Sequence, residues 1–169
     1  MAKIYTGIGS RQTPAEVLAL MTRIAQVLDA KGYILRSGGA AGADTAFAQG
    51  ATHREIFLPW PNFNSVRDGI VVHGAAWAQA EALARTIHPA WNRLSQGAAR
   101  LHTRNIFQVL GAGLDQPAQF VLFWAPEQAG AVQGGTRTAV MLARQRGIPC
   151  FNLADPTARA RLERFVAGR

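Results

Sequence analysis

The sequence contains one cysteine, Cys150, which excludes an intrachain disulfide and a cysteine-rich metal site. Cys150 lies in the apolar run 148–153, so we expect a buried and unreactive thiol. No apolar stretch is long enough to cross a bilayer, and the first residues lack the apolar core of a signal peptide. These absences predict a cytoplasmic protein without a membrane partner.

Acidic residues are scarce, and lysine is almost absent. The chain has 10 Asp and Glu against 18 Lys and Arg, a net charge of +8, and its only lysines are Lys3 and Lys31. Arginine suits bidentate contacts with phosphate, so this balance favours an anionic partner such as a nucleotide or nucleic acid. A general arginine bias in the encoding genome would give the same balance, and composition alone leaves both explanations open.

Metal-ligand patterns and known nucleotide motifs are also missing. The histidines, His53, His73, His88 and His102, lack the spacing of metal ligands, so we expect no metal and no other cofactor. No Walker A sequence is present, which argues against NTP hydrolysis of that kind. The segment 7–12 begins like a dinucleotide fingerprint but lacks its third glycine, which argues against a standard NAD site.

What is present is a globular composition. The 169 residues are 49% hydrophobic and 17% charged, without repeats or low-complexity tracts, which predicts one domain over residues 1–169. Short apolar runs alternate with helical patterns. Strands are expected at 3–8, 33–36, 55–58, 119–124 and 147–153, and helices at 14–31, 44–51, 74–86, 96–110, 136–146 and after Asp155-Pro156.

This alternation predicts an α/β fold: a doubly wound, mainly parallel sheet of five or six strands, Rossmann-like, with helices on both faces. Local signals mark the helix ends. Thr13 is expected to cap the first helix, with Pro14 in its first turn and Glu16 completing a capping box. The last helix carries Arg159, Arg161, Arg164 and Arg169, which form either a solvated face or a basic contact surface.

The run 37–44, Ser-Gly-Gly-Ala-Ala-Gly-Ala-Asp, joins a predicted strand to a predicted helix. A glycine turn at a helix start leaves backbone N–H groups free and lets a ligand approach closely, which suits a phosphate. An ordinary tight turn would also use Gly and Ser, so the run alone supports both interpretations.

Two further loops follow predicted strands, at 7–12 and 125–136, and the second contains another glycine pair, Gly134-Gly135. In an open parallel sheet such loops meet at the carboxyl ends of the strands, where ligands bind. We therefore predict a phosphate site in these loops, containing Ser10, Arg11, Ser37, Asp44 and Thr136 together with the glycines.

The chain resembles the Rossmann-type superfamily (SLOG) that joins the DNA-processing proteins DprA, also called Smf, to the LOG phosphoribohydrolases that activate cytokinins. The resemblance covers about residues 4–153. It is carried by Gly9-Ser10-Arg11, the run Ser37-Gly38-Gly39-Ala40-Ala41-Gly42-Ala43-Asp44 with Ala48 and Gly50-Ala51, Arg104-Asn105, Gly134-Gly135-Thr136, Ala143 and Gly147-Ile148-Pro149.

Resemblance to DprA implies binding of single-stranded DNA, with Gly9, Ser10, Arg11, the 37–44 loop, Arg104 and Asn105 lining a phosphate pocket. DprA proteins usually carry extra domains, which this sequence does not show. The superfamily commonly dimerises, so the resemblance also implies a homodimer.

Resemblance to LOG implies instead hydrolysis of the N-glycosidic bond of a nucleoside 5′-monophosphate. The LOG motif is Pro-Gly-Gly-x-Gly-Thr-x-x-Glu, but the matching run here, 133–139, is shorter and lacks the glutamate. Asp44 and Glu127 are the candidates for a replacement carboxylate. Asp44 at a helix start could equally be a cap.

Three aromatic residues near the strand ends could stack on a base: Trp60, Phe63 and Trp124. Trp60, which has prolines on both sides, is the preferred candidate, and Trp124 is expected in the core. Three functions follow as hypotheses. The first is DprA-like binding of single-stranded DNA or nucleotide at the glycine loops, the second is LOG-like hydrolysis, and the third is non-catalytic sensing of a small signalling nucleotide.

Overall fold

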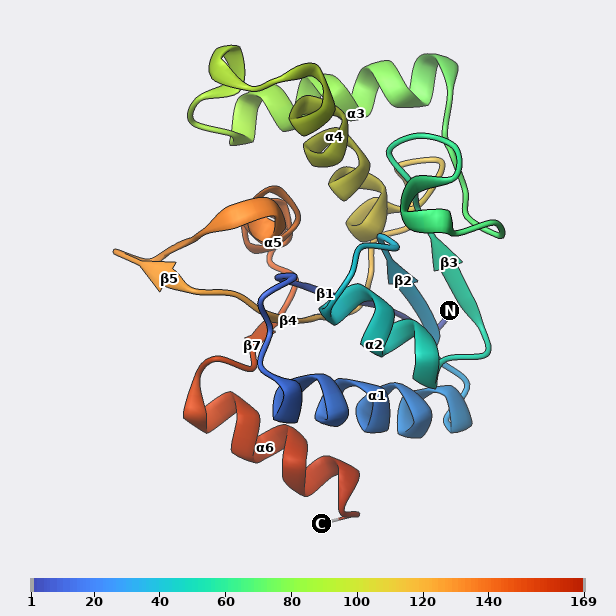
Figure 1. The fold of residues 1–169 in the computed structure, drawn as a ribbon, viewed down its shortest axis with the longest axis vertical. Coiled ribbons are helices and arrows are strands. Elements are labelled where there is room, and N and C mark those ends of the chain that lie inside the picture. Colours follow the sequence, from blue (N-terminus) through green and yellow to red (C-terminus); the bar gives the residue numbers. More distant parts are fainter. Residues whose placement is uncertain (1, 169) are drawn as a thin grey trace.

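The computed structural model describes residues 2–168 and has a five-stranded sheet at its centre (Figure 1). The strands are β1 (Ile4–Gly9), β2 (Ile34–Ser37), β3 (Arg54–Ile56), β4 (Val121–Trp124) and β7 (Cys150–Asn152). Their order is β3-β2-β1-β4-β7 and every neighbouring pair is parallel. This arrangement confirms the predicted doubly wound α/β fold.

Helices cover both faces of the sheet (Figure 1). One face carries α1 (Ala15–Ala30), α2 (Ala43–Gly50) and α6 (Pro156–Val166), and the other carries α4 (Gln96–Leu110) and α5 (Arg137–Gln145), with α3 (Gly74–Ile87) packed on these two helices. Each face has its own buried apolar cluster, and β1 contributes to both, with Tyr5 in one and Ile8 in the other. A strand buried on both faces explains why the strand segments read as continuous apolar runs.

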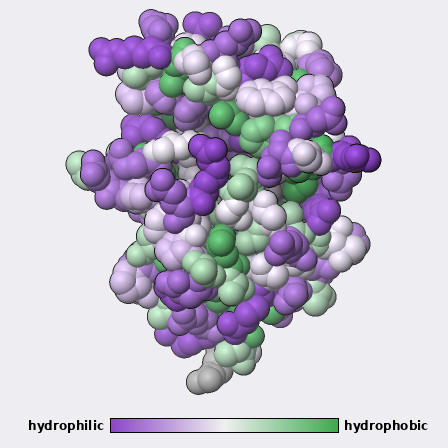
Figure 2. Space-filling view, in the orientation of Figure 1, coloured by the Kyte–Doolittle hydropathy of each residue, from purple (hydrophilic) through white to green (hydrophobic). Residues whose placement is uncertain are grey.

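Short elements complete the chain. Three 3-10 helices, η1 (Phe63–Ser65), η2 (Trp91–Arg93) and η3 (Gly134–Thr136), lie in the loops. The segment 125–133, predicted as a plain loop, contains an antiparallel hairpin of β5 (Glu127–Gln128) and β6 (Ala131–Val132) that projects from the body (Figure 1). On the face in Figure 2, hydrophilic side chains surround small, scattered apolar groups. None of the helices within residues 2–168 is long and apolar enough to span a membrane.

The helix-end predictions had different outcomes. The bounds of α4 match the prediction, and Asp155 caps α6 by accepting a hydrogen bond from the Thr157 N–H at 3.2 Å. The predicted capping box of α1 is wrong: Pro14 occupies the N-cap position and no side chain caps the helix. The Thr13 hydroxyl instead donates to the Ser10 carbonyl at 2.6 Å. This hydrogen bond closes the loop after β1, so the hydroxyl is not available to cap α1. Of the arginines on the last helix, Arg169 lies outside the described residues.

Candidate functional site

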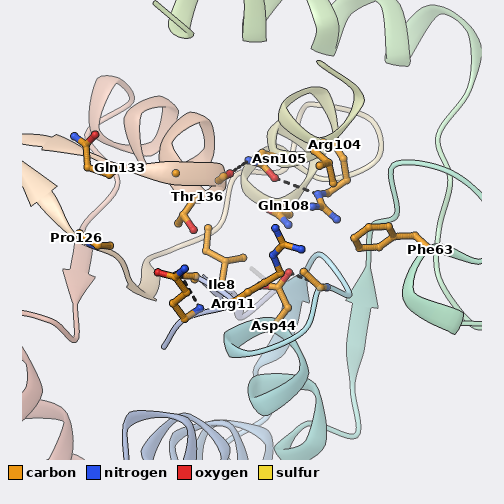
Figure 3. A pocket seen from close by; sticks show the side chains of 17 residues that line it. Ile8, Arg11, Asp44, Phe63, Arg104, Asn105, Gln108, Pro126, Gln133 and Thr136 are labelled. Carbon is orange, nitrogen blue, oxygen red and sulfur yellow. Dashed lines mark hydrogen bonds between the residues drawn. The ribbon is translucent and has the colours of Figure 1, made fainter. Parts of the chain in front are cut away.

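A cavity of about 440 Å³ lies at the carboxyl end of β1 (Figure 3). From β1 the chain winds outward through β2 and β3, and β4 then starts the other half of the sheet on the opposite side of β1. This reversal of strand order is the usual place for a ligand in an open α/β sheet. The cavity is lined by Ile8, Gly9, Ser10, Arg11, Gln12, Ala40, Asp44, Phe63, Leu101, Arg104, Asn105, Gln108, Pro126, Gln133, Gly134, Gly135 and Thr136.

The cavity brings together most of the predicted site residues from segments far apart in sequence. Those that line it are Gly9, Ser10, Arg11, Asp44, Phe63, Arg104, Asn105, Gly134, Gly135 and Thr136. The remaining candidates do not contribute to its wall: Ser37, Gly38, Gly39, Gly42, Trp60, Trp124 and Glu127. Trp124 packs against the apolar cluster around Tyr5, as its expected core role requires.

The loop after β1 presents Arg11 to the cavity. The Ser10 N–H donates to the Trp124 carbonyl at 3.0 Å, which continues the pairing of β1 with β4. The Ser10 hydroxyl then accepts from the Gln12 N–H at 2.9 Å, which closes a tight turn around Arg11. Arg11 is exposed, and its side chain lies on the same side of the cavity as Asp44 (Figure 3). The guanidinium is therefore available to an anionic ligand.

Asp44 occupies the cavity floor at the start of α2. Only 4% of the residue is exposed, and one carboxylate oxygen, Oδ2, accepts from the Ala40 N–H at 3.1 Å. The other oxygen, Oδ1, is buried without a hydrogen-bond partner among the described residues. Burial raises the pKa of Asp44 to about 6, against the opposing effect of the Arg104 charge. A carboxyl group in such surroundings changes its protonation near neutral pH.

Arg104 reaches the cavity from α4 but is held by backbone carbonyls. Its guanidinium donates to the carbonyl of Gly38 and, at 3.1 Å, to that of Phe57. Only 5% of the residue is exposed, and burial lowers its pKa to about 10, with Asp44 opposing the shift. Arg104 thus joins α4 to the glycine loop after β2 and places a positive charge beside the cavity.

The second glycine turn is more open than the first. The Asn105 side chain donates to the Gly135 carbonyl at 2.6 Å, which fixes the turn against α4. Gly134 has φ +82°, a conformation that favours glycine, and both glycines are exposed. No side chain caps η3 or the following α5. The first N–H of α5, that of Arg137, donates to the Gly134 carbonyl, so the donors that this end offers to a ligand are those of the glycine turn itself.

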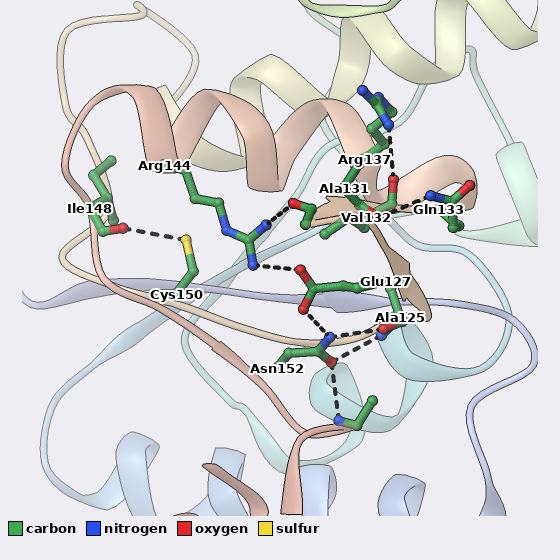
Figure 4. Close-up of polar contacts among 12 residues, drawn as sticks. Ala125, Glu127, Ala131, Val132, Gln133, Arg137, Arg144, Ile148, Cys150 and Asn152 are labelled. Carbon is green, nitrogen blue, oxygen red and sulfur yellow. Dashed lines mark hydrogen bonds and ion pairs between the residues drawn. The ribbon is translucent and has the colours of Figure 1, made fainter. Parts of the chain in front are cut away.

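Glu127, the other candidate carboxylate, lies outside the cavity on the β5–β6 hairpin (Figure 4). It pairs with Arg144 at 3.0 Å and accepts from the Asn152 side chain at 2.9 Å. The hydrogen bond from Asn152, followed by the hydrogen bond and charge of Arg144, lowers the pKa of Glu127. These contacts make Glu127 a structural anchor of the hairpin. Within residues 2–168, no three His, Cys, Asp or Glu side chains form a group that could hold a metal ion.

Gln108 lines the cavity but was not among the predicted site residues. On α4, the adjacent residues Arg104 and Asn105 lie three or four residues from both Leu101 and Gln108, so the four residues share one helix face. Helical spacing from Arg104 and Asn105 was a signal that could have identified Gln108. The cavity is also lined by Gln12, Pro126 and Gln133. The sequence indicated these residues only through their positions next to predicted loop residues.

No family model and no curated protein sequence matches this chain. Among solved structures, the chain is similar to DNA processing protein A (DprA) from Streptococcus pneumoniae, with a TM-score of 0.52 and 17% identity. That match covers 90% of this chain and 50% of the other, so this chain spans half the length of the Streptococcus protein.

A second solved structure, described for the single-stranded DNA binding mode of DNA processing protein A from Helicobacter pylori, gives a TM-score of 0.40 and 14% identity. This match covers 99% of this chain and 79% of the chain of the Helicobacter protein. The match to the Streptococcus protein shows that this chain adopts a DprA-like, Rossmann-type α/β fold.

Proposed function

We propose that the cavity binds the phosphate group of a nucleotide, either free or as part of single-stranded nucleic acid. The observation that carries the proposal is the convergence, in one cavity, of exposed Arg11 and the uncapped glycine turn at Gly134-Gly135. A guanidinium and free backbone N–H groups are the donors that phosphate oxygens accept from. The cavity volume of about 440 Å³ lies in the range of sites for nucleotide-sized ligands.

The wider electrostatics agree with an anionic ligand. The net charge of +8 draws phosphate toward the molecule, and Arg104 offsets the carboxyl group of Asp44 inside the cavity. The fold shared with the Streptococcus protein, which is named for DNA processing, supports DNA as the source of that phosphate.

The test is fluorescence anisotropy of a labelled single-stranded oligonucleotide at low and moderate salt, with nucleoside monophosphates as competitors. We expect binding that weakens steeply as salt rises, because phosphate contacts release counterions. Replacing Arg11 by alanine should weaken binding by about 1–3 kcal/mol, as expected for a charge-assisted contact. The matched control is Arg23→Ala, which removes the same charge from an exposed position on α1 away from the cavity. Equal affinities of the two variants would remove Arg11 from the site.

A second candidate function is hydrolysis of a nucleotide N-glycosidic bond, which the raised pKa of Asp44 in the cavity favours. Binding without chemistry is preferred because Asp44 is held by the Ala40 N–H on the cavity floor and Glu127 lies outside the cavity. Incubation with nucleoside monophosphates, followed by chromatography for free base, separates the two functions. Release of base by the wild type that is lost in Asp44→Asn would establish the hydrolase instead.

A further inference from the structure

Two aromatic side chains, Trp60 and Phe63, are not explained by core packing. Every other tryptophan, tyrosine and phenylalanine belongs to, or packs against, one of the two apolar clusters. Trp60 and Phe63 instead contact each other edge to face, with ring centroids 5.3 Å apart and an interplanar angle of 87°. Both are half-buried, and Phe63 lines the cavity. Large aromatic residues outside a core, at the rim of a cavity, are typical of ligand contacts.

The turn that carries these rings has an unusual backbone. Asn62, Asn64 and Ser65 all have positive φ, at 62°, 50° and 60°. Residues other than glycine adopt this conformation at a cost, and such residues cluster at functional sites. The Asn64 side chain donates to the Gly39 carbonyl at 3.0 Å, which ties the turn to the glycine loop after β2. The turn thus holds Phe63 at the cavity instead of letting it join the apolar core.

Basic groups lie next to the turn that carries the two rings. The Arg104 guanidinium lies over the ring of Phe63, 5.5 Å from the ring centroid. Arg100, whose guanidinium lies over the ring of Trp77, donates to the Pro59 carbonyl at 3.0 Å, one residue before Trp60. Aromatic faces next to guanidinium groups combine base stacking with attraction for the phosphate backbone.

We propose that Phe63 and Trp60 bind two successive bases of a single-stranded nucleic acid. This inference rests on the proposed function, because the phosphate bound in the cavity determines which nucleotide of the strand lies beside Phe63. Phe63, which lines the cavity, stacks on the base of the nucleotide whose phosphate is bound there. Trp60, next to Phe63 but outside the cavity wall, stacks on the neighbouring base. The perpendicular rings fit two bases that are splayed apart and do not suit two bases stacked on each other.

The experiment compares three competitors in the anisotropy assay: deoxyribose 5-phosphate, thymidine 5′-monophosphate and the dinucleotide pTpT. Phe63→Leu should weaken both base-bearing ligands about tenfold and leave deoxyribose 5-phosphate unchanged. Trp60→Leu should weaken pTpT by a similar factor and leave the monophosphate unchanged. Trp60→Phe retains an aromatic face and should recover most of the pTpT affinity, and thermal unfolding checks that each variant is folded.

Two outcomes would overturn the inference while leaving phosphate binding intact: no loss of pTpT affinity in Trp60→Leu, or an equal loss for the monophosphate and pTpT. An equal loss of deoxyribose 5-phosphate in Phe63→Leu would also overturn it, since the ring would then act on the phosphate site itself. Failure of the wild type to bind any of the three ligands, or the oligonucleotide, would overturn the proposed function together with the inference.

Discussion

The two glycine pairs of this protein have the same sequence but opposite surroundings. A Cβ on Gly38 would collide with the Gln108 amide and lie 2.7 Å from Arg104 Nη1, and one on Gly39 would lie 2.9 Å from Leu58 Cδ2. A Cβ on Gly134 or Gly135 would meet no heavy atom within 4 Å. The first pair is thus enclosed by side chains, whereas the second is open.

This difference shows that one sequence pattern has two physical causes. At Gly38-Gly39 the missing side chains make room for Arg104, Gln108 and Leu58, so the glycines serve packing between β2, α4 and the loop after β3. At Gly134-Gly135 they leave the backbone accessible at a cavity wall. Of the two turns, the second is the one that a phosphate can approach closely without moving protein atoms.

The largest effect that separates the two turns should come from Arg104→Ala. The substitution leaves the buried carbonyls of Gly38 and Phe57 without their donor and removes the opposing charge from Asp44. We expect a loss of about 3–5 kcal/mol in the free energy of unfolding, measured by urea denaturation. Arg11→Ala, which changes an exposed arginine at the same cavity, should leave that free energy nearly unchanged. Similar stabilities of the two variants would contradict the packing role of Arg104.

Titration of Asp44 provides a second test of the enclosed turn. Its pKa of about 6 in the folded protein is above the ordinary value of 3.8, because burial disfavours the charged form. Between pH 3.8 and about pH 6, Asp44 therefore keeps its proton in the folded state and has lost it in the unfolded state. The free energy of unfolding should fall as the pH rises through this range. The contribution reaches about 3 kcal/mol at most. The measurement is urea denaturation of the wild type and Asp44→Asn at pH 4 and at pH 7. The difference in free energy of unfolding between the two proteins should change between these pH values, and the same difference at both would exclude the contribution of Asp44.

Gly38→Ala tests the enclosed turn at its most crowded point. The added methyl group would displace the Gln108 amide and the Arg104 guanidinium, and the guanidinium is held by the carbonyls of Gly38 and Phe57. Overpacking of this kind costs about 1–3 kcal/mol. Thermal unfolding should show a lower Tm, and an unchanged Tm would mean that α4 can shift to make room.

Gly135→Ala should have the smallest effect on stability and is the matched control for Gly38→Ala. The residue has no positive φ, and an added methyl group would meet no heavy atom within 4 Å, so we expect a change below about 0.5 kcal/mol. Oligonucleotide affinity should nevertheless fall, because the methyl group projects at the open turn that we propose for the phosphate. Unchanged affinity, measured by anisotropy, would place the phosphate elsewhere in the cavity.

Several features followed from the sequence because their causes are local. Apolar runs broken by glycine predicted the parallel sheet, and α4 formed with the predicted bounds because its residues favour helix and glycine follows at 111. The helix expected after Asp155-Pro156 begins there, with Asp155 as its cap, since a cap needs only its own neighbours. The convergence of the loops after β1, β2 and β4 was predictable because parallel strands place their carboxyl ends together.

Other features needed distant parts of the chain. The capping box of α1 was wrong because Thr13 bonds to Ser10 in a loop shaped by the β1–β4 pairing. Trp60 was the preferred stacking candidate, yet Phe63 lines the cavity, because the side chain that faces the cavity depends on a turn with three left-handed residues. Such backbone conformations are set by tertiary contacts and leave no clear pattern in the sequence.

The sequence by itself thus determined the fold class and the segments that surround the cavity, since both depend on apolar patterning and on where strands end. Only the tertiary structure decided which glycine pair is enclosed and which is open. Gly38 and Arg104 are 66 residues apart, and no local signal shows that an arginine of α4 fills the space beside the first turn. The chemistry of the cavity therefore depends on which side chains reach it across the sheet, and that is a property of packing.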